Sequence, residues 1–218
     1  MVPSTVWLYH ITAVDNLPSV LAQGGLLSNT SLQNTEVVPR SIAHATIQAR
    51  REQLVVPCGP GGSIHDYVPF FLAPRPPMLY SVNRGQVSSY RDGQESIIYL
   101  VTTIRRVQQA GTAFVFTDGH ATHPDTQMFS DLAQLNQIDW SVLESGFYWA
   151  GDAELKRRRQ AEFLVHSFVP WPAISKIGVY NEAMRRRVWE ILQDLRPTPL
   201  VGIHTEWYDP GTGHGDEL

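Results

Sequence analysis

The stretch Arg157-Arg158-Arg159-Gln160-Ala161-Glu162-Phe163-Leu164-Val165-His166 places a carboxylate at the start of an apolar run. Residues 163–165 are aromatic or branched, which predicts a short buried β-strand. Strand alternation puts Glu162, Leu164 and His166 on one face and the odd-numbered residues on the other. A carboxylate in such a strand carries a desolvation cost unless it is paired or used. Glu162 is therefore either the partner of one of the preceding arginines or a functional residue.

The length of the chain, 218 residues with 43% hydrophobic side chains, is enough for one large core. No change of composition marks a linker, so we expect a single domain over residues 1–208. The polar, glycine-containing segment 209–218 is expected to be a disordered tail.

The charge balance is mildly acidic, with a formal net charge of -4 and 17% charged residues. Bulk positive charge cannot hold nucleic acid here, so any such contact must use local basic patches. Cys58 is the single cysteine, which excludes a disulfide framework and a cysteine metal cluster. The first residues lack the pattern of a signal peptide and no apolar run is long enough to span a membrane. We therefore expect a cytoplasmic, monomeric protein.

The order of apolar segments predicts an α+β fold, because helices and strands do not alternate strictly. Strands are expected at residues 6–11, 67–72, 96–103, 113–117, 163–165, 174–180 and 199–204. Helices are expected at residues 17–23, 41–52, 129–135, 139–145 and 182–195, the last capped by Asn181. Residues 26–40 are expected to form a loop that orders on a ligand.

Several common sites are not supported by the motifs. Neither G-x-G-x-x-G after a strand nor a P-loop occurs, and G-x-S-x-G is absent as well. The eight histidines form no H-E-x-x-H pair, and no H-x-E occurs with a C-x-x-C. We expect no metal site.

Three motifs in order resemble the DarT toxins, which are DNA ADP-ribosyltransferases of bacterial toxin–antitoxin systems. They are Tyr9-His10-Ile11-Thr12, the segment from Val68-Pro69-Phe70-Phe71 to Met78-Leu79-Tyr80, and Arg159-Gln160-Ala161-Glu162-Phe163-Leu164-Val165. The resemblance runs from about Trp7 to the last strand. It implies a fold like that of the poly(ADP-ribose) polymerases, with a split central β-sheet, surrounding helices and a cleft for NAD.

The activity that the resemblance implies is transfer of ADP-ribose from NAD onto a base, thymine, in single-stranded DNA in a short sequence context. NAD would be the only cofactor, consumed as a cosubstrate, and a macrodomain antitoxin that removes the modification would be the partner. Two alternatives stay open. The same fold could act on guanine, RNA or protein, or the chain could be a non-catalytic nucleotide- or nucleic-acid-binding module.

The resemblance also implies roles for particular residues. Glu162 matches the catalytic glutamate, and Arg51 stands where the family carries a supporting arginine. The adjacent Arg50 matches the same position of the family, so both arginines remain candidates. His10 matches a histidine that contacts the ribose and adenosine side of NAD. The cofactor-binding candidates are His10, Thr12, Gly24, Leu26, Arg51 and Phe71.

The chemistry of the transfer explains why these residue types are needed. Loss of nicotinamide builds positive charge on the ribose, which a carboxylate stabilises more in the transition state than in the ground state. Thymine must lose its ring proton to act as nucleophile, so a base is needed and a nearby cation would stabilise the anion. Glu162 and Arg51 would satisfy these needs.

Contact with DNA would combine local cations with aromatic side chains, as single-strand binding does. The candidates are Arg75, Met78, Arg91, His120, Trp149 and Arg157. We interpret Arg185 to Arg187 as the solvated face of the last helix, since Val188, Ile191 and Leu192 would face the core.

Overall fold

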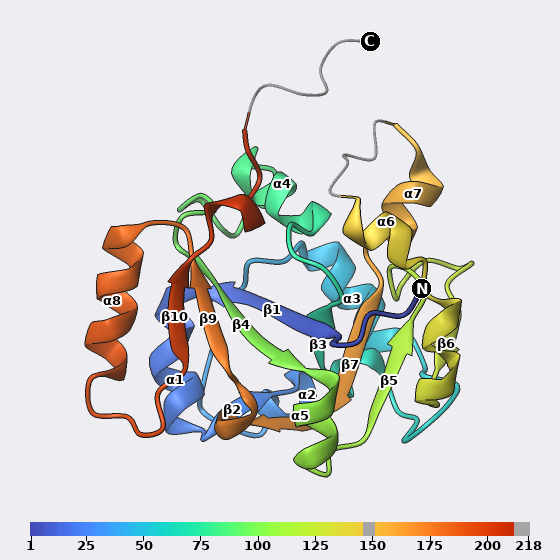
Figure 1. Ribbon diagram of the computed structural model, residues 1–218, viewed down its shortest axis with the longest axis horizontal. Coiled ribbons are helices and arrows are strands. Elements are labelled where there is room, and N and C mark those ends of the chain that lie inside the picture. Colours follow the sequence, from blue (N-terminus) through green and yellow to red (C-terminus); the bar gives the residue numbers. More distant parts are fainter. Residues whose placement is uncertain (146–150, 212–218) are drawn as a thin grey trace.

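The computed structural model describes residues 1–145 and 151–211 and shows a large mixed sheet with helices around it (Figure 1). The strand order is β10-β9-β4-β1-β3-β7-β5-β6. In chain order the strands are β1 Trp7–Ala13, β3 Tyr67–Phe71, β4 Ile97–Thr103, β5 Phe114–Thr117, β6 Met128–Phe129, β7 Glu162–His166, β9 Lys176–Val179 and β10 Leu200–Ile203. A second, two-stranded sheet pairs β2 Gly25–Leu27 with β8 Phe168–Pro170.

The large sheet divides between β1 and β3. β1 pairs with β4 along its whole length, from Trp7↔Thr103 to Ala13↔Ile97, and β3 pairs with β7 from Tyr67↔His166 to Phe71↔Glu162. β1 and β3 share one registered pair, Tyr9↔Phe71. The two half-sheets therefore meet at this pair and separate beyond it, which confirms the predicted split sheet.

The core follows the alternation of the strands. Phe163 and Val165 of β7 lie in the main apolar cluster, whereas Leu164 packs with Tyr67 and Val115 in a smaller one. All three β7 residues are fully buried. The predicted assignment of β7 residues to two faces is thus confirmed, and it places the Glu162 side chain on the face of Leu164, away from the main core.

The helices surround the sheet. They are α1 Leu17–Ala22, α2 Asn29–Gln33, α3 Ala45–Gln53, α4 Pro77–Asn83, α5 Ile104–Gln109, α6 Trp140–Glu144, α7 Ala153–Arg158 and α8 Glu182–Leu192. Figure 1 shows α8 beside β9 and β10 at one end of the sheet, with α6, α7 and β6 at the other. α8 begins as predicted, because the Asn181 side chain accepts the N–H of Met184 at 2.9 Å.

Three predicted elements need correction. Residues 26–40 contain β2 and α2, because Leu26 pairs with the distant Val169 and the Ser28 hydroxyl caps α2. The helix expected from Ser41 begins at Ala45, after the cap residue His44. Residues 129–135 hold the end of β6 and part of a 3-10 helix, Leu132–Gln137. Pairing with residues distant in sequence overrides local propensity at β2 and β6.

Asp209, where we expected a disordered tail to begin, is held in the fold. Asp209 is 3% exposed, and its side chain accepts from Asn83 Nδ2 at 2.6 Å. Its backbone exchanges two hydrogen bonds with the amide of Gln94, at 2.7 and 2.8 Å. Residues 209–211 belong to the described structure, and 212–218 lie outside the described residues. Within the described ranges no helix has the length and apolarity to cross a membrane.

Candidate active site

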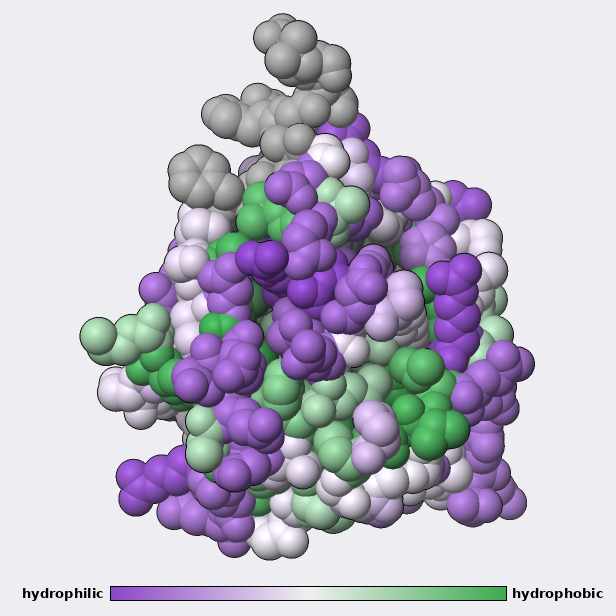
Figure 2. Space-filling view, turned by 90° about the vertical axis from the view of Figure 1, so that its right-hand side faces the viewer, coloured by the Kyte–Doolittle hydropathy of each residue, from purple (hydrophilic) through white to green (hydrophobic). Residues whose placement is uncertain are grey.

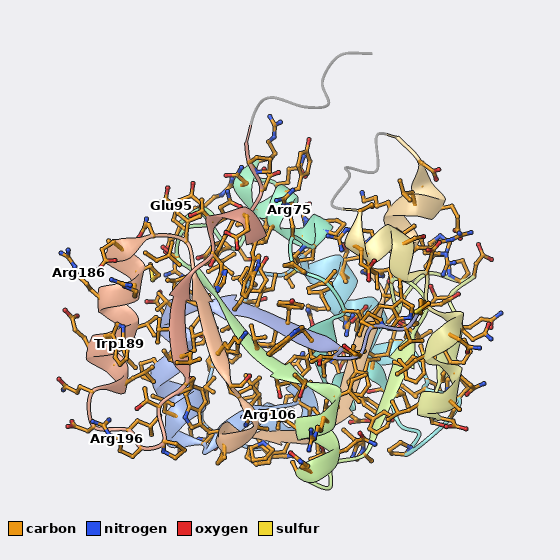
Figure 3. The ribbon with its side chains drawn as sticks, viewed as in Figure 1. Arg75, Glu95, Arg106, Arg186, Trp189 and Arg196 are labelled. Atoms are coloured by element: carbon orange, nitrogen blue, oxygen red, sulfur yellow. The ribbon has the colours of Figure 1, made fainter. Side chains whose placement is uncertain are left out.

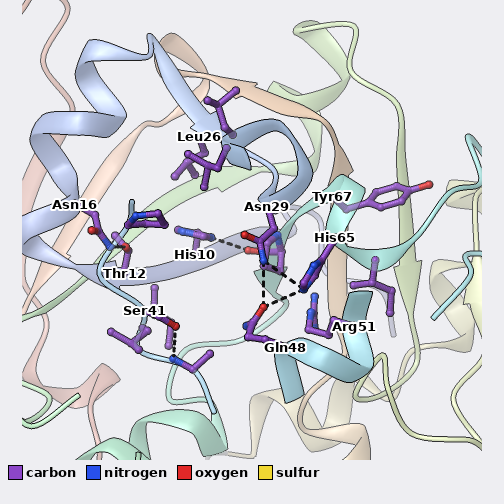
Figure 4. Close-up of a pocket in the computed structure, with 18 of the residues that line it drawn as sticks. His10, Thr12, Asn16, Leu26, Asn29, Ser41, Gln48, Arg51, His65 and Tyr67 are labelled. Carbon is purple, nitrogen blue, oxygen red and sulfur yellow. Dashed lines mark hydrogen bonds between the residues drawn. The ribbon is translucent and has the colours of Figure 1, made fainter. Parts of the chain in front are cut away.

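A cavity of about 470 Å³ opens where the half-sheets separate. His10 to Thr12 of β1 line one side, and Tyr67, Phe71 and Glu162 line the other. The segment from Val37 to Ala43 and helix α3 complete the wall. Figure 4 shows His10, Thr12, Asn29, Gln48 and Arg51 pointing into the same space from different elements. Much of this pocket is therefore built by the sheet, which is a rigid support for a reacting centre.

Glu162 lies at the start of β7 and forms an ion pair with Arg51. Arg51 Nη1 donates to both carboxylate oxygens, at 3.1 Å to Oε1 and 2.9 Å to Oε2. The N–H of Ala121 donates to Oε1 at 3.0 Å, and Thr117 Oγ1 accepts from the N–H of Glu162. The Glu162 side chain is 3% exposed and that of Arg51 10%. The charged carboxylate is thus paired and held in one orientation, as burial requires.

The choice between Arg50 and Arg51 follows from helix geometry. Both lie in the last turn of α3, but one is exposed and the other buried, because neighbouring helix residues point about 100° apart. Arg51 is the arginine that faces the cavity. Its Nη2 is buried and has no hydrogen-bond partner. This nitrogen remains as a donor that a ligand could satisfy.

The alternative explanation of Glu162, pairing with a preceding arginine, is wrong. Arg157 donates to Glu154 and Asp118, and Arg158 donates to Glu154 and Asp139. Arg159 donates to the backbone oxygen of Pro74. The partner of Glu162 is separated from it by 111 residues, so the local sequence could not reveal it.

His10 presents one ring nitrogen to the cavity. The carbonyl of Pro69 can only accept, so the 2.8 Å contact means that Nδ1 carries the proton. Burial lowers the pKa of His10, and this outweighs the Pro69 bond that favours protonation. The neutral ring leaves Nε2 as a hydrogen-bond acceptor in the cavity, which suits a hydroxyl group.

Thr12 also lines the cavity, but its hydroxyl accepts from Asn16 Nδ2 at 2.9 Å. The same amide group of Asn16 holds the backbone of Arg40 by two bonds, Nδ2 to O at 2.9 Å and N to Oδ1 at 2.7 Å. Asn16 is 9% exposed. Sequence reasoning assigned Asn16 no role in the site and so missed that it fixes the segment that closes one side of the cavity.

A polar cluster beside Arg51 was also missed. His65 Nε2 lies 3.1 Å from Gln48 Oε1 and 3.3 Å from Asn29 Nδ2. His65 Nδ1 is buried without a partner. Burial and the positive charge of Arg51 lower the pKa of His65. These residues come from α2, α3 and the 3-10 turn before β3, so no motif in the chain brings them together.

His120 lines the cavity from the loop between β5 and β6. Its Nδ1 lies 2.9 Å from the Thr122 hydroxyl. Burial lowers the pKa of His120, an effect that the negative charge of Glu162 opposes. A neutral ring at this position could contact a second substrate next to Glu162.

The other predicted residues divide into two groups. Phe71, Leu26 and Met78 line the cavity together with Arg51, His10, Thr12 and His120. Gly24 does not line the cavity, whereas the neighbouring Gly25 does; the Gly24 carbonyl accepts from the N–H of Trp171. Arg91 is exposed and donates to the carbonyl of Gly85. Trp149 lies outside the described residues.

Arg157 and Arg75 also lie away from the cavity. Arg157 is 7% exposed and its guanidinium is bound to Glu154, Asp118 and Thr126, so its contacts are structural rather than free for DNA. Arg75 lines a second, smaller cavity. Among the described residues no cluster of histidine, cysteine or carboxylate side chains could hold a metal ion.

A split sheet with a buried glutamate at the end of one half and a histidine across the cleft defines an ADP-ribosyltransferase. Comparison with known proteins narrows the class. Residues 9–209 match the sequence model of a family described as "ssDNA thymidine ADP-ribosyltransferase, DarT". The chain belongs to this family, so the predicted fold and the predicted class of enzyme, a DNA ADP-ribosyltransferase, are confirmed.

Individual relatives agree with the family match. A DNA ADP-ribosyl transferase of Thermus sp. (strain 2.9) is 41% identical over 94% of this chain and 97% of its own length. The structure of Thermus sp. 2.9 DarT with ADP-ribosylated ssDNA superposes with a TM-score of 0.89, at 40% identity, covering 95% of this chain and 98% of that one. The complex of the same Thermus protein with NAD+ superposes with a TM-score of 0.86 at 38% identity, covering 96% of this chain and 100% of that one.

A longer relative combines two activities in its name. It is a "DNA ADP-ribosyl transferase-DNA ADP-ribosyl glycohydrolase fusion protein" of Thermosipho africanus. It is 25% identical over 96% of this chain but only 51% of its own length. The present chain therefore corresponds to about half of the fusion protein.

Proposed function

We propose that this enzyme transfers ADP-ribose from NAD to a thymine of single-stranded DNA and releases nicotinamide, with Glu162 and Arg51 at the reacting centre. The observation that carries the proposal is the buried Glu162–Arg51 pair, which faces the cavity between the half-sheets. Family membership and relatives solved with NAD+ and with modified DNA support the choice of substrates.

The cavity offers complementary contacts for NAD. His10 Nε2 would accept from a ribose hydroxyl, and the apolar side chains of Leu26, Ile42 and Phe71 would cover the rings. The nicotinamide ribose would lie toward Glu162, since the carboxylate must be near this ribose to stabilise its positive charge. The ion pair with Arg51 holds the Glu162 carboxylate in one orientation, in which it can stabilise positive charge on the ribose.

The transfer step follows from the atoms left available. The bond between the ribose carbon and the nicotinamide nitrogen breaks, and nicotinamide leaves as a neutral molecule with the bonding electrons. A ring nitrogen of thymine forms the new bond to that carbon and gives its proton to Glu162. The unpartnered Nη2 of Arg51 would donate to a thymine carbonyl oxygen, where negative charge develops.

Substitution of Glu162 tests the proposal most directly. We expect Glu162→Gln to lower modification of a thymine-containing oligonucleotide by at least about 1,000-fold, measured by mass spectrometry, because the isostere cannot accept the proton. Binding of NAD, measured by calorimetry, should change by less than about tenfold. The exposed Glu190→Gln on α8 serves as a matched control and should behave as the unmodified enzyme does.

The acceptor is tested with oligonucleotides of mixed sequence, because we expect the bases around the target to influence the reaction. Incubation with NAD should add the mass of ADP-ribose to oligonucleotides that contain thymine and not to those in which every thymine is replaced by another base. Gain of mass on guanine, RNA or protein instead would replace thymine as the acceptor, and nicotinamide release without any acceptor would contradict a transferase dedicated to DNA.

We also propose that the chain acts as a cytoplasmic monomer with a separate macrodomain partner that removes ADP-ribose from DNA. The fusion of the two activities in the Thermosipho africanus relative supports such a pairing. Coexpression with a macrodomain ADP-ribosyl glycohydrolase should restore growth of cells that express this enzyme, and an inactive glycohydrolase variant should not.

A further inference from the structure

A second cavity of about 340 Å³ lies on the other side of the Tyr9↔Phe71 pair. The main cavity is lined by residues after Tyr9 in β1 and up to Phe71 in β3. The second is lined by Trp7 and Tyr9 in β1 and by Leu72 to Arg75 after β3. Because the two strands are antiparallel, the linings of the two cavities follow one another along the junction of the half-sheets.

Two residues that line this second cavity each carry a hydrogen-bond donor without an acceptor. Arg159 is 6% exposed, and its Nη1 is buried without a partner while Nη2 donates to the Pro74 carbonyl at 2.8 Å. The Nε of Arg75 is also buried without a partner. A buried donor without an acceptor is unfavourable, so this arrangement favours a ligand with acceptor atoms.

The position of Arg75 is imposed by its surroundings. Its backbone is in the left-handed region, with φ at 58°, which is unfavourable for a residue with a side chain. The Tyr99 hydroxyl accepts its N–H at 3.2 Å, and the side chain donates to the carbonyl of Glu206. Figure 3 shows Arg75 next to α4. Burial lowers the pKa of Arg159, and the like charge of the nearby Arg75 lowers it further.

The remaining lining decides the kind of ligand. Trp7, Tyr9 and Trp140 supply aromatic surface, and Leu72 and Leu143 add apolar surface. The carboxylates of Glu144 and Glu206 also line the cavity and would repel a phosphate group. A neutral planar ring with acceptor atoms on one edge fits better, because it can stack on the aromatic groups and accept from the guanidinium groups.

We propose that this second cavity receives a base flanking the target thymine and reads it through Arg159, with Arg75 beside it. The inference rests on the proposed function, because the ligand belongs to the same DNA strand. Two hydrogen-bond donors favour a base edge with two adjacent hydrogen-bond acceptors. Guanine presents such an edge at O6 and N7, and cytosine at O2 and N3. Adenine and thymine alternate donors with acceptors on their edges.

The approach to this cavity is compatible with DNA. It lies near α6 and α7, and Figure 2 shows the face of the molecule that carries them. Hydrophilic residues gather over the middle and upper part of this face. Residues 159 and 160 are neighbours in the chain, yet Arg159 lines the second cavity and Gln160 the main one. A single strand could thus place adjacent or near-adjacent bases in the two cavities.

The test measures base preference rather than rate alone. Oligonucleotides with one target thymine and each of the four bases at every flanking position are incubated with NAD and analysed by mass spectrometry. We expect the unmodified enzyme to favour guanine or cytosine at one flanking position by about 10-fold or more. Arg159→Met should remove this preference at that position and leave preferences elsewhere intact.

Matched variants separate base reading from damage to the fold. Arg106 also donates to a backbone carbonyl, that of Pro172 at 3.2 Å, but is exposed and distant from both cavities, so Arg106→Met should keep the full preference (Figure 3). Should Arg159→Met not fold, Arg75→Gln provides the same readout at a half-buried residue. A uniform loss of rate with unchanged preference would overturn the proposal, and so would an unmodified enzyme without any flanking preference.

An abasic site distinguishes a base from the DNA backbone as the ligand. Removal of the base at the preferred position should lower modification by the unmodified enzyme to the level of Arg159→Met. If the abasic oligonucleotide were modified as well as the intact one, the cavity would bind the phosphodiester instead and base reading would be wrong. Failure to modify any thymine-containing oligonucleotide would contradict the proposed function, which is a separate outcome.

Discussion

At the scale of single residues, the site depends on which way one arginine points. Arg51 and Arg50 are neighbours on α3 with the same chemistry, but only Arg51 reaches Glu162. Its Nη1 orients the carboxylate and its Nη2 remains free for substrate. A lysine could supply the charge but not both contacts, because the planar guanidinium presents several donors in a fixed geometry.

Substitution of the two arginines should therefore give opposite results. We expect Arg51→Ala to lower kcat for DNA modification by about 100-fold or more, and Arg51→Lys to recover only part of it. Arg50→Ala should stay within about threefold of the unmodified enzyme, with the kinetics followed by nicotinamide release. Equal losses for Arg50→Ala and Arg51→Ala would show that α3 as a whole, and not the Glu162 contact, supports the reaction.

At the scale of elements, the segment from Val37 to Ala43 has no regular structure and yet closes one side of the main cavity. Asn16 holds its backbone at Arg40, and the Arg40 side chain pairs with Asp15 and Asp92. The Asp15 and Asp92 pairs are exposed and contribute little. The buried amide of Asn16 is therefore the main polar attachment, beside the buried apolar side chain of Ile42.

Loss of that amide should loosen the segment without removing a group that touches the reacting atoms. We expect Asn16→Ala to raise KM for NAD by about 5- to 50-fold with kcat changed less than about threefold, and to lower the free energy of unfolding by about 1–3 kcal/mol. Asn34→Ala is the matched control, because Asn34 is exposed and its amide bonds only to the carbonyl of Thr30. A fall in kcat with unchanged KM would contradict a purely positioning role.

The same element shows what sequence could and could not reveal. Strands such as 97–103 and the capped helix α8 were predicted because their periodicity and caps are local. The strand and helix within residues 26–40 were not predicted, because β2 forms through pairing with the distant β8. Glu162, Arg51 and His10 were named from the resemblance to the family and His120 as a candidate for DNA contact, whereas Asn16, Asn29, Gln48 and His65 were missed. Their roles arise from contacts between distant segments.

At the scale of the whole molecule, the cavity concentrates neutral histidines. Burial lowers the pKa values of His10, His65 and His120, and all three line the same space. In the unfolded chain their pKa is about 6.5. As pH falls below this value the unfolded chain takes up protons that the folded protein does not, so the folded state loses stability.

We therefore expect the free energy of unfolding to fall between pH 6.5 and 5, a window above that of the carboxylates. The pKa values of Asp15, Asp66 and Glu154 are lowered, Glu154 to about 2, so their contribution is lost only at more acidic pH. Each neutral histidine contributes a slope of at most about 1.4 kcal/mol per pH unit, reduced where solvent reaches the ring. Urea unfolding at pH 7.5, 6.5 and 5.5 measures the decrease.

The variant His10→Asn should reduce the change of the free energy of unfolding with pH. Asparagine can keep a donor to the Pro69 carbonyl but does not titrate. His44→Asn is the control, as His44 stands at the N-cap position of α3 without a capping hydrogen bond from its side chain and lies outside the cavity lining. Saturating NAD should make the free energy of unfolding of the unmodified protein depend more steeply on pH. Ligand binding adds to folded-state stability, and protonation of His10 Nε2 removes the acceptor for the ribose hydroxyl. The same slope in both variants would mean that the loss of stability at acidic pH originates outside the NAD cavity.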